Sequence, residues 1–141
     1  DHKIHAIRWI PETDRPVCIV QIVHGMAEYI DRYDEFASYL AERGILVVGD
    51  DHLGHGKSVR PGEPYGYFCK EDAATVLVRD EHRLKKMTQE QYPDIPYIIL
   101  GHSMDRRRCY RGYGDAVKAN VDSSPDAGRI PENILWIKTC K

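Results

Sequence analysis

The sequence has 141 residues, of which 42% are hydrophobic and 30% charged, a balance that suits one globular domain and excludes a disordered or fibrous chain. Its net charge of −2 gives no bulk attraction to nucleic acid or to an anionic membrane. The four cysteines form no CxxC pair, which argues against a zinc ribbon and fits a reducing, cytoplasmic location. No apolar run has membrane-spanning length and no signal peptide is visible, so we expect no transmembrane segment.

Charge is distributed unevenly along the chain. Residues 105–141 contain eight Lys and Arg against five Asp and Glu, whereas residues 1–104 contain twelve against seventeen. The two parts therefore carry net charges of opposite sign and differ in character. Because the chain also begins at Asp1 and not at Met, we expect it to be a fragment.

The first predicted elements are two strands and a helix. Ile4–Ile10 alternates apolar and polar residues, which predicts a half-buried strand. Val17–Val23 is almost continuously apolar, as is typical of a strand buried on both faces of a parallel sheet. Apolar residues then recur at helical spacing over residues 33–40, with Asp31 or Asp34 as the expected N-cap.

A second strand, helix and strand follow. Apolar residues from Ile45 predict another buried strand, and a Gly- and Pro-rich loop separates it from a helix over Ala73–Tyr92. Tyr97–Leu100 predicts a third buried strand. The expected apolar stripe of the helix consists of Ala73, Val76, Leu77, Leu84 and Met87.

This alternation of strands and helices predicts an α/β fold, a parallel βαβ sheet with flanking helices and right-handed crossovers. In such open sheets the chemistry lies beyond the carboxyl ends of the strands. Three loops leave those ends, with the sequences HGMAEY, DDHLGHGKS and GHSM, and all three are rich in Gly and His.

The GHSM loop has most features of a nucleophile turn. A serine on a sharp strand-to-helix turn needs small neighbours two residues away on each side, hence the pattern G-x-S-x-G after an apolar strand. Gly101 and Ser103 satisfy this pattern, but Asp105 stands where the second glycine belongs. Ser103 is therefore a candidate nucleophile, with an ordinary serine at a strand end as the alternative.

The HGM sequence at residues 24–26 supports the nucleophile. A tetrahedral oxyanion needs two preorganised N–H donors, one from the residue after the nucleophile and one from the loop after an earlier strand. Met104 and Met26 occupy those two positions, and Gly25 allows close approach of the backbone. The alternative is that His24 and Gly25 only form a tight turn.

With these motifs in order, the chain resembles the α/β-hydrolase family of monoacylglycerol lipases and bacterial lysophospholipases, the serine-aminopeptidase-like hydrolases. The resemblance extends from Ile4 to Met104 and rests on HGMAE, RY, DHLGHGKS and GHSM. It implies an incomplete α/β-hydrolase fold, no cofactor, and a small-molecule acyl ester or lysophospholipid as substrate.

The resemblance also implies roles for individual residues. Ser103 would be the nucleophile, and the backbone N–H groups of Met26 and Met104 would bind the oxyanion. Supporting positions implied by the family are His24, Gly25, Glu28, Arg32, Gly101, His102 and the DDHLGHG turn.

Two other interpretations of these residues are possible. Asp50, Asp51, His52 and His55 have metal-ligand side chains, but the family turn accounts for them, so we expect no metal. The run of arginines from Arg106 could bind nucleic acid, but it is short and lacks a recognisable motif.

The family pattern stops after Met104. We therefore expect two parts, residues 1–104 as the N-terminal part of an α/β-hydrolase domain and residues 105–141 as a non-family, poorly ordered tail with one short strand at Ile134–Ile137. All seven histidines lie at or before position 102, so the triad histidine that should follow the serine is missing.

Three functions fit this pattern. The first is a serine hydrolase of carboxylic esters, truncated after the nucleophile by a frame change or gene truncation and catalytically impaired. The second is a non-catalytic remnant or lipid-binding module. The third is an interaction protein that uses its basic tail.

Overall fold

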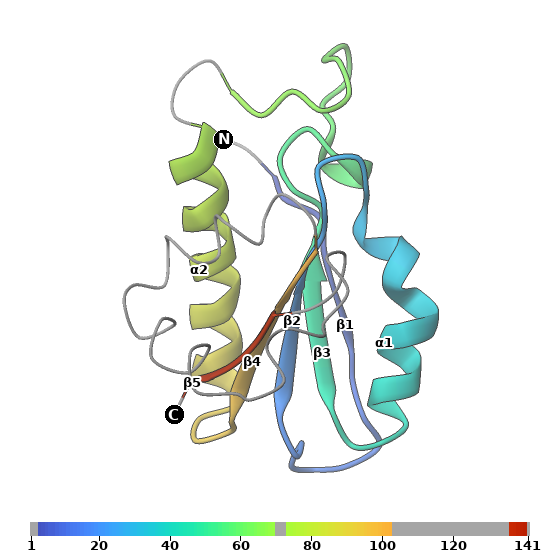
Figure 1. The fold of residues 1–141 in the computed structure, drawn as a ribbon, viewed down its shortest axis with the longest axis vertical. Coiled ribbons are helices and arrows are strands. Elements are labelled where there is room, and N and C mark those ends of the chain that lie inside the picture. Colours follow the sequence, from blue (N-terminus) through green and yellow to red (C-terminus); the bar gives the residue numbers. More distant parts are fainter. Residues whose placement is uncertain (1–2, 70–72, 103–135, 141) are drawn as a thin grey trace, which may run out of the picture.

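The computed structural model describes residues 3–69, 73–102 and 136–140, which form one five-stranded sheet in the order β1-β3-β2-β4-β5. Strands β2, β3 and β4 are parallel, while β1 and β5 pair antiparallel at the two sides (Figure 1). The elements are β1 (Ala6–Trp9), β2 (Ile19–Val23), η1 (Ile30–Tyr33), α1 (Asp34–Ala41), β3 (Leu46–Asp50), η2 (Gly56–Ser58), α2 (Ala73–Gln91), β4 (Tyr97–Gly101) and β5 (Trp136–Cys140).

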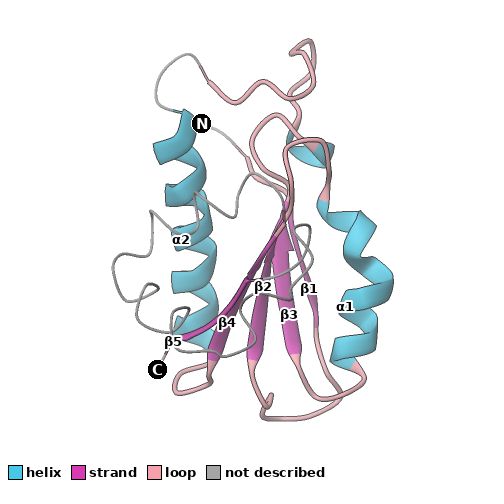
Figure 2. Cartoon of the chain, viewed as in Figure 1, coloured by secondary structure: helices cyan, strands magenta, loops and turns pink. Residues whose placement is uncertain are grey.

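Helices α1 and α2 lie on opposite sides of the sheet (Figure 2). Alternate residues of the central strands therefore face different helices. Ile19 and Val23 of β2 belong to the apolar cluster that includes Leu84 of α2, whereas Val20 and Ile22 pack in the cluster with Ala37 of α1. This burial on both faces is why β2 and β3 are apolar at almost every position, and it confirms the predicted parallel βαβαβ layer.

The helix caps differ from the sequence prediction. Neither Asp31 nor Asp34 is an N-cap, because η1 precedes α1 and the cap positions fall on Tyr29 and Tyr33. Asp34 lies instead in the first turn of α1, where it accepts a hydrogen bond of 2.8 Å from the Trp9 indole N–H. A carboxylate in this turn still interacts favourably with the helix dipole.

The buried face of α2 also differs from the predicted stripe. Met87 is 60% exposed, whereas Leu77, Glu81 and Thr88 are buried. Together with Leu84, these residues follow steps of four, three and four, which trace one face of a helix. The predicted stripe included only apolar residues, and it therefore missed Glu81, a glutamate at the centre of the buried face.

One strand lies in the predicted tail. The short strand expected at residues 134–137 is present as β5, at 136–140, and it pairs antiparallel with the full length of β4. β4 is consequently an inner strand of the sheet. The expectation of poor order for residues 105–135, like Ser103 and Met104 themselves, lies outside the described residues.

Central packing of β2 should dominate stability. Replacing Ile22, which is fully buried, with Ala should lower the free energy of unfolding by about 2–5 kcal/mol because it leaves a cavity beneath α1. The matched control Ile10→Ala removes a side chain that is 59% exposed and should change it by less than about 0.5 kcal/mol. Urea unfolding measures both, and equal effects would contradict the described core.

Candidate active site

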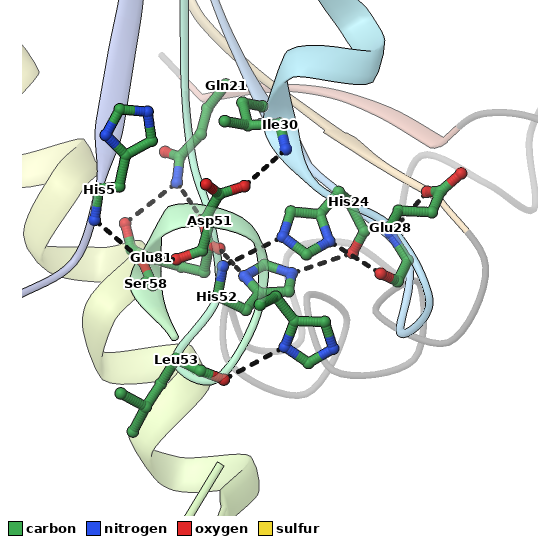
Figure 3. A network of polar contacts seen from close by, with 12 residues as sticks. His5, Gln21, His24, Glu28, Ile30, Asp51, His52, Leu53, Ser58 and Glu81 are labelled. Atoms are coloured by element: carbon green, nitrogen blue, oxygen red, sulfur yellow. Dashed lines mark hydrogen bonds and ion pairs between the residues drawn. The ribbon is translucent and has the colours of Figure 1, made fainter. Parts of the chain in front are cut away.

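The HGMAEY and DDHLGHGKS loops leave the carboxyl ends of β2 and β3, at the same end of the sheet as Gly101 and His102 at the end of β4 (Figure 1). Their polar side chains form a connected network, most of which Figure 3 shows. Residues 51–55 and His24 are buried, while Met26 at the tip of the first loop is 52% exposed.

His24 is fully buried and both of its ring nitrogens are engaged. Its Nε2 accepts a hydrogen bond of 3.0 Å from the His52 backbone N–H, so the ring proton is on Nδ1, which donates to the Gly25 carbonyl at 2.8 Å. Burial and the neighbouring His52 lower the pKa of His24 to about 4. His24 is therefore neutral, and its hydrogen bonds leave it no nitrogen for use as a base.

His52 and His55 fix the same loop from the other side. The His52 ring stacks on that of His24, with centroids 3.8 Å apart, and its Nε2 donates to the His24 carbonyl at 2.9 Å. His55 Nε2 donates to the Met26 carbonyl at 2.5 Å. These bonds hold the backbone of the HGM loop on both sides of Gly25.

Asp51 joins the first loop to the GHGKS turn. One carboxylate oxygen accepts from the Ile30 N–H at 2.7 Å and the other from the Lys57 N–H at 2.8 Å. Its carbonyl accepts from the Ser58 hydroxyl at 2.7 Å. All three oxygens of Asp51 therefore accept hydrogen bonds, the two carboxylate oxygens from backbone N–H groups and the carbonyl oxygen from a hydroxyl.

Two positions of this turn require glycine, both because of their backbone conformation and because there is no room for a side chain. Gly54 and Gly56 both have positive φ, at 77° and 47°. A Cβ on Gly54 would lie 2.0 Å from the Tyr67 carbonyl oxygen, and one on Gly56 would lie 2.3 Å from the Asp51 carboxyl carbon. The two glycines thus allow the turn to pack closely against its neighbours.

Glu28 connects the first loop to the end of β4. Its Oε2 accepts from the Gly25 N–H at 2.9 Å, the Tyr33 hydroxyl at 2.8 Å and His102 Nδ1 at 2.8 Å. Burial raises the pKa of Glu28, but these hydrogen bonds outweigh it and leave the pKa below its usual value. Arg32 adds an ion pair of 3.5 Å to the other oxygen.

The predicted site residues are only partly visible in this arrangement. Gly101 pairs with Val23, and the His102 N–H donates to the Val23 carbonyl at 3.0 Å, so the ends of β2 and β4 are adjacent. Among residues 3–69 and 73–102, nothing accepts a hydrogen bond from the Met26 N–H. The roles of Ser103 and Met104 concern residues outside the described part of the chain.

A second polar group lies between the sheet and α2, and the sequence analysis missed it. Glu81 is 3% exposed and accepts hydrogen bonds from the amide of Gln21, which in turn accepts from the Tyr97 hydroxyl at 2.6 Å. Glu81 also faces His52 and Asp50. The one sequence signal was Gln21, a lone polar residue in an otherwise apolar strand.

Comparison with known proteins agrees with this geometry. Residues 14–104 match the family described as "Serine aminopeptidase, S33". The chain is 38% identical over 101 residues to the "Monoglyceride lipase homolog" of monkeypox virus and 36% identical over 96 residues to the "Monoglyceride lipase" of Mus musculus. These matches cover 72% and 68% of this chain but 34% and 29% of the relatives, so the chain spans about a third of their length.

A solved structure shows the same likeness. The chain superposes on a thermostable carboxyl esterase from Bacillus coagulans with a TM-score of 0.67 and 38% identity, over 74% of this chain and 33% of the esterase. Sheet order, flanking helices and the Gly-rich loops at the carboxyl ends therefore define part of an α/β-hydrolase. More narrowly, the chain belongs to the serine aminopeptidase family S33.

Within residues 3–69 and 73–102, no helix combines the length and the apolar character needed to span a bilayer.

Close packing at Gly54 gives a test of the turn. Gly54→Ala and Gly62→Ala both place a side chain at positive φ, which costs about 1–2 kcal/mol at either position. Only Gly54→Ala adds a clash with backbone, because a Cβ on Gly62 meets nothing within 4 Å. We expect Gly54→Ala to lower the unfolding midpoint in urea clearly more than Gly62→Ala, and equal midpoints would contradict the described turn.

The Glu28 bridge should make stability depend on pH. A carboxyl with a lowered pKa in the folded state stabilises the fold above its unfolded value, near 4.5, and this contribution is lost as pH falls through the folded pKa. Glu28→Gln should therefore reduce the free energy of unfolding at pH 6–7, and the difference from the unmodified chain should shrink below about pH 4.5.

Urea titrations across this pH range test the bridge. The control Glu35→Gln changes an exposed carboxylate in the first turn of α1. A Glu28→Gln effect that stays constant from pH 7 to pH 3 would show that shape, and not charge, matters at this position.

Proposed function

We propose that this chain carries the nucleophile half of a serine hydrolase that acts on carboxylic esters. Ser103 is the nucleophile, and the backbone N–H groups of Met26 and Met104 stabilise the oxyanion. The observation that carries the proposal is the Glu28 bridge, which binds the Gly25 N–H and the His102 ring with one carboxylate oxygen. It holds the loop of Met26 beside the residue that precedes Ser103.

The proposed chemistry is acyl transfer. The Ser103 hydroxyl adds to the ester carbonyl, the alcohol leaves, and water then releases the acid from the acyl-enzyme. An N–H donor without a competing acceptor suits the oxyanion position, and among the described residues the Met26 N–H has none. The names of the relatives favour a monoacylglycerol as the substrate, and the resemblance described above adds lysophospholipids as a second class of acyl ester.

We further propose that this particular chain is catalytically impaired. A serine hydroxyl needs a base to accept its proton, and no histidine follows position 102 in the 141 residues. His24 is unsuited to replace it, because both of its nitrogens are occupied within the core. His102 precedes Ser103 directly, its side chain is 42% exposed and Glu28 orients it through Nδ1, so among the described histidines it is the candidate that we would test first.

The sequence after the nucleophile supports the same proposal. The family match ends at residue 104, and Asp105 replaces the glycine of the turn. A carboxylate there adds bulk where the turn is tightest and negative charge near the developing oxyanion. We attribute the change to an altered reading frame or a gene truncation after the Ser103 codon, which leaves residues 105–141 as a non-family tail of a cytoplasmic chain.

A non-catalytic lipid-binding role is the second candidate. It is favoured by four large side chains on the loops of the site that remain 38–57% exposed, namely Met26, Tyr29, Tyr65 and Tyr67. Amphipathic tyrosines and flexible methionines suit contact with an acyl chain. This function requires the site geometry but no base.

Hydrolysis of p-nitrophenyl butyrate and of a monoacylglycerol tests the proposal. The unmodified chain and Ser103→Ala should both act barely faster than buffer, and Asp105→Gly alone should not restore turnover because the base is still absent. A chimaera that carries the matching C-terminal part of the mouse relative in place of residues 105–141 should gain Ser103-dependent turnover and fluorophosphonate labelling.

Two results would contradict these assignments. Clear Ser103-dependent turnover by the unmodified chain would overturn the impairment, and loss of that turnover in His102→Gln would identify the base. An inactive chimaera that is folded by circular dichroism would overturn the assignment of the nucleophile. Saturable binding of a fluorescent monoacylglycerol without turnover would favour the second candidate.

A further inference from the structure

Three side chains with metal-ligand atoms converge on the α2 side of the sheet. Asp50 ends β3, His52 begins the loop after it, and Glu81 comes from the middle of α2. Their side chains are 2%, 1% and 3% exposed. One ligand atom from each lies within 4.8 Å of the other two, and the His52 Nδ1 to Glu81 Oε1 distance is 3.3 Å.

The hydrogen bonds around His52 direct its other nitrogen to the two carboxyl groups. Its Nε2 donates to the His24 carbonyl, so in the neutral ring Nδ1 carries a lone pair that faces Glu81 (Figure 3). A histidine that ligates a metal usually donates its second N–H to a backbone carbonyl or a carboxylate in this way. The ring is therefore already oriented as a ligand.

The carboxyl oxygens point to the same conclusion. Asp50 Oδ1 is buried and has no hydrogen-bond partner among the described residues, which is costly for an oxygen removed from water. Oε2 of Glu81 accepts from the Gln21 amide, and this leaves Oε1 directed at His52. Among the ion pairs of the described residues, none joins a Lys or Arg to either carboxyl group, and the His52 imidazole is the basic group that faces Glu81.

Oxygen and nitrogen donors in this combination suit a particular ion. Zinc accepts imidazole nitrogen and carboxylate oxygen at about 2.0–2.2 Å, which places tetrahedral ligands about 3.4 Å apart. His52 and Glu81 already have this spacing, and the Asp50 oxygen lies within 4.8 Å of both. Three protein ligands leave the fourth position to water.

We propose that Asp50, His52 and Glu81 bind one divalent transition-metal ion of the zinc type, in a structural centre that joins α2 to the carboxyl end of β3. From the sequence we expected no metal, because the family turn accounts for Asp50, Asp51, His52 and His55. Asp51 and His55 turn to backbone groups, while Glu81, almost thirty residues further on, completes the set.

The ion would also steady the site of the proposed function, although its binding does not depend on that function. His52 contacts the ion through Nδ1, the His24 carbonyl through Nε2, and the His24 ring through its own backbone N–H. Fixing His52 therefore fixes the loop that presents Met26. A single proton shared between Asp50 and Glu81 is the competing way to neutralise the cluster, and the experiment distinguishes the two.

Metal binding is measured on the full 141-residue chain after treatment with a chelator and dialysis. One equivalent of Zn²⁺ should bind per chain in competition with a chromophoric chelator, and it should raise the thermal midpoint by about 5 °C. Glu81→Gln keeps the size and the hydrogen bond from Gln21 but removes the charge, and it should weaken zinc binding at least 100-fold. Asp50→Asn should do the same.

The matched control is His82→Gln, which removes an exposed imidazole next to Glu81 on α2 and should leave both measurements unchanged. Since a variant could fail to fold, the unmodified chain is also loaded with Co²⁺. Intense visible absorption from a four- or five-coordinate ion with a nitrogen ligand is expected, and a spectrum like that of aqueous Co²⁺ would overturn the proposal.

Other outcomes are equally decisive. The proposal fails if Zn²⁺ does not stabilise the unmodified chain, or if folded Glu81→Gln and Asp50→Asn variants retain the full affinity. It also fails if both variants are more stable than the unmodified chain and none of the three binds metal, because a shared proton then suffices. Zinc binding together with an inactive chimaera would support the metal centre and reject only the proposed function.

Discussion

The carboxyl end of the sheet depends on a reciprocal pair of hydrogen bonds between residues 24 and 52. The His52 N–H donates to the His24 ring, and the His52 ring donates to the His24 carbonyl. Each bond contributes only about 1 kcal/mol net, but a buried group left without its partner costs about 1–3 kcal/mol. Because an imidazole accepts a hydrogen bond only when neutral, the pair also keeps His24 uncharged in a fully buried position. Loops from two strands thus become one rigid unit, to which Asp51 and Glu28 attach the rest.

The sequence predicted the fold well because its strongest signals are physical requirements of a parallel sheet. Strands such as β2 and β3, with a helix on each side, must be apolar at nearly every position, and few other structures impose that pattern. The loops were identifiable for a similar reason: Gly54 and Gly56 have positive φ and lie against other atoms, so no other residue type fits. These local constraints can be recognised in a short stretch of sequence without knowledge of distant contacts.

The remaining features depend on distant contacts. Glu81 can be buried because Gln21 and His52 provide polar partners for it across the interface between α2 and the sheet. A helical pattern alone would predict an apolar residue at this position. Asp31 and Asp34 have the right side chains for a cap, but a preceding 3-10 turn and the Trp9 indole assign them other partners. In both cases a contact with a residue distant in the sequence determines the position of a charged side chain. The local sequence pattern carries no information about such a contact.

The position of β2 between β3 and β4 has a consequence for how the site is held together. The crossover from β2 goes to one neighbour and packs α1 on one face, while the chain after β3 returns over the other face through α2. Connections that leave in opposite directions create a topological switch point, where no crossover covers the ends of the adjacent strands. Among the residues that the structure describes, the side chain of Glu28 joins the ends of β2 and β4 at that gap, beyond the hydrogen bonds of their ladder. With this strand order, residues on the loops at the gap can be replaced without disturbing a crossover connection. Loss of the Glu28 carboxylate, in contrast, would remove the contact that joins the two strand ends.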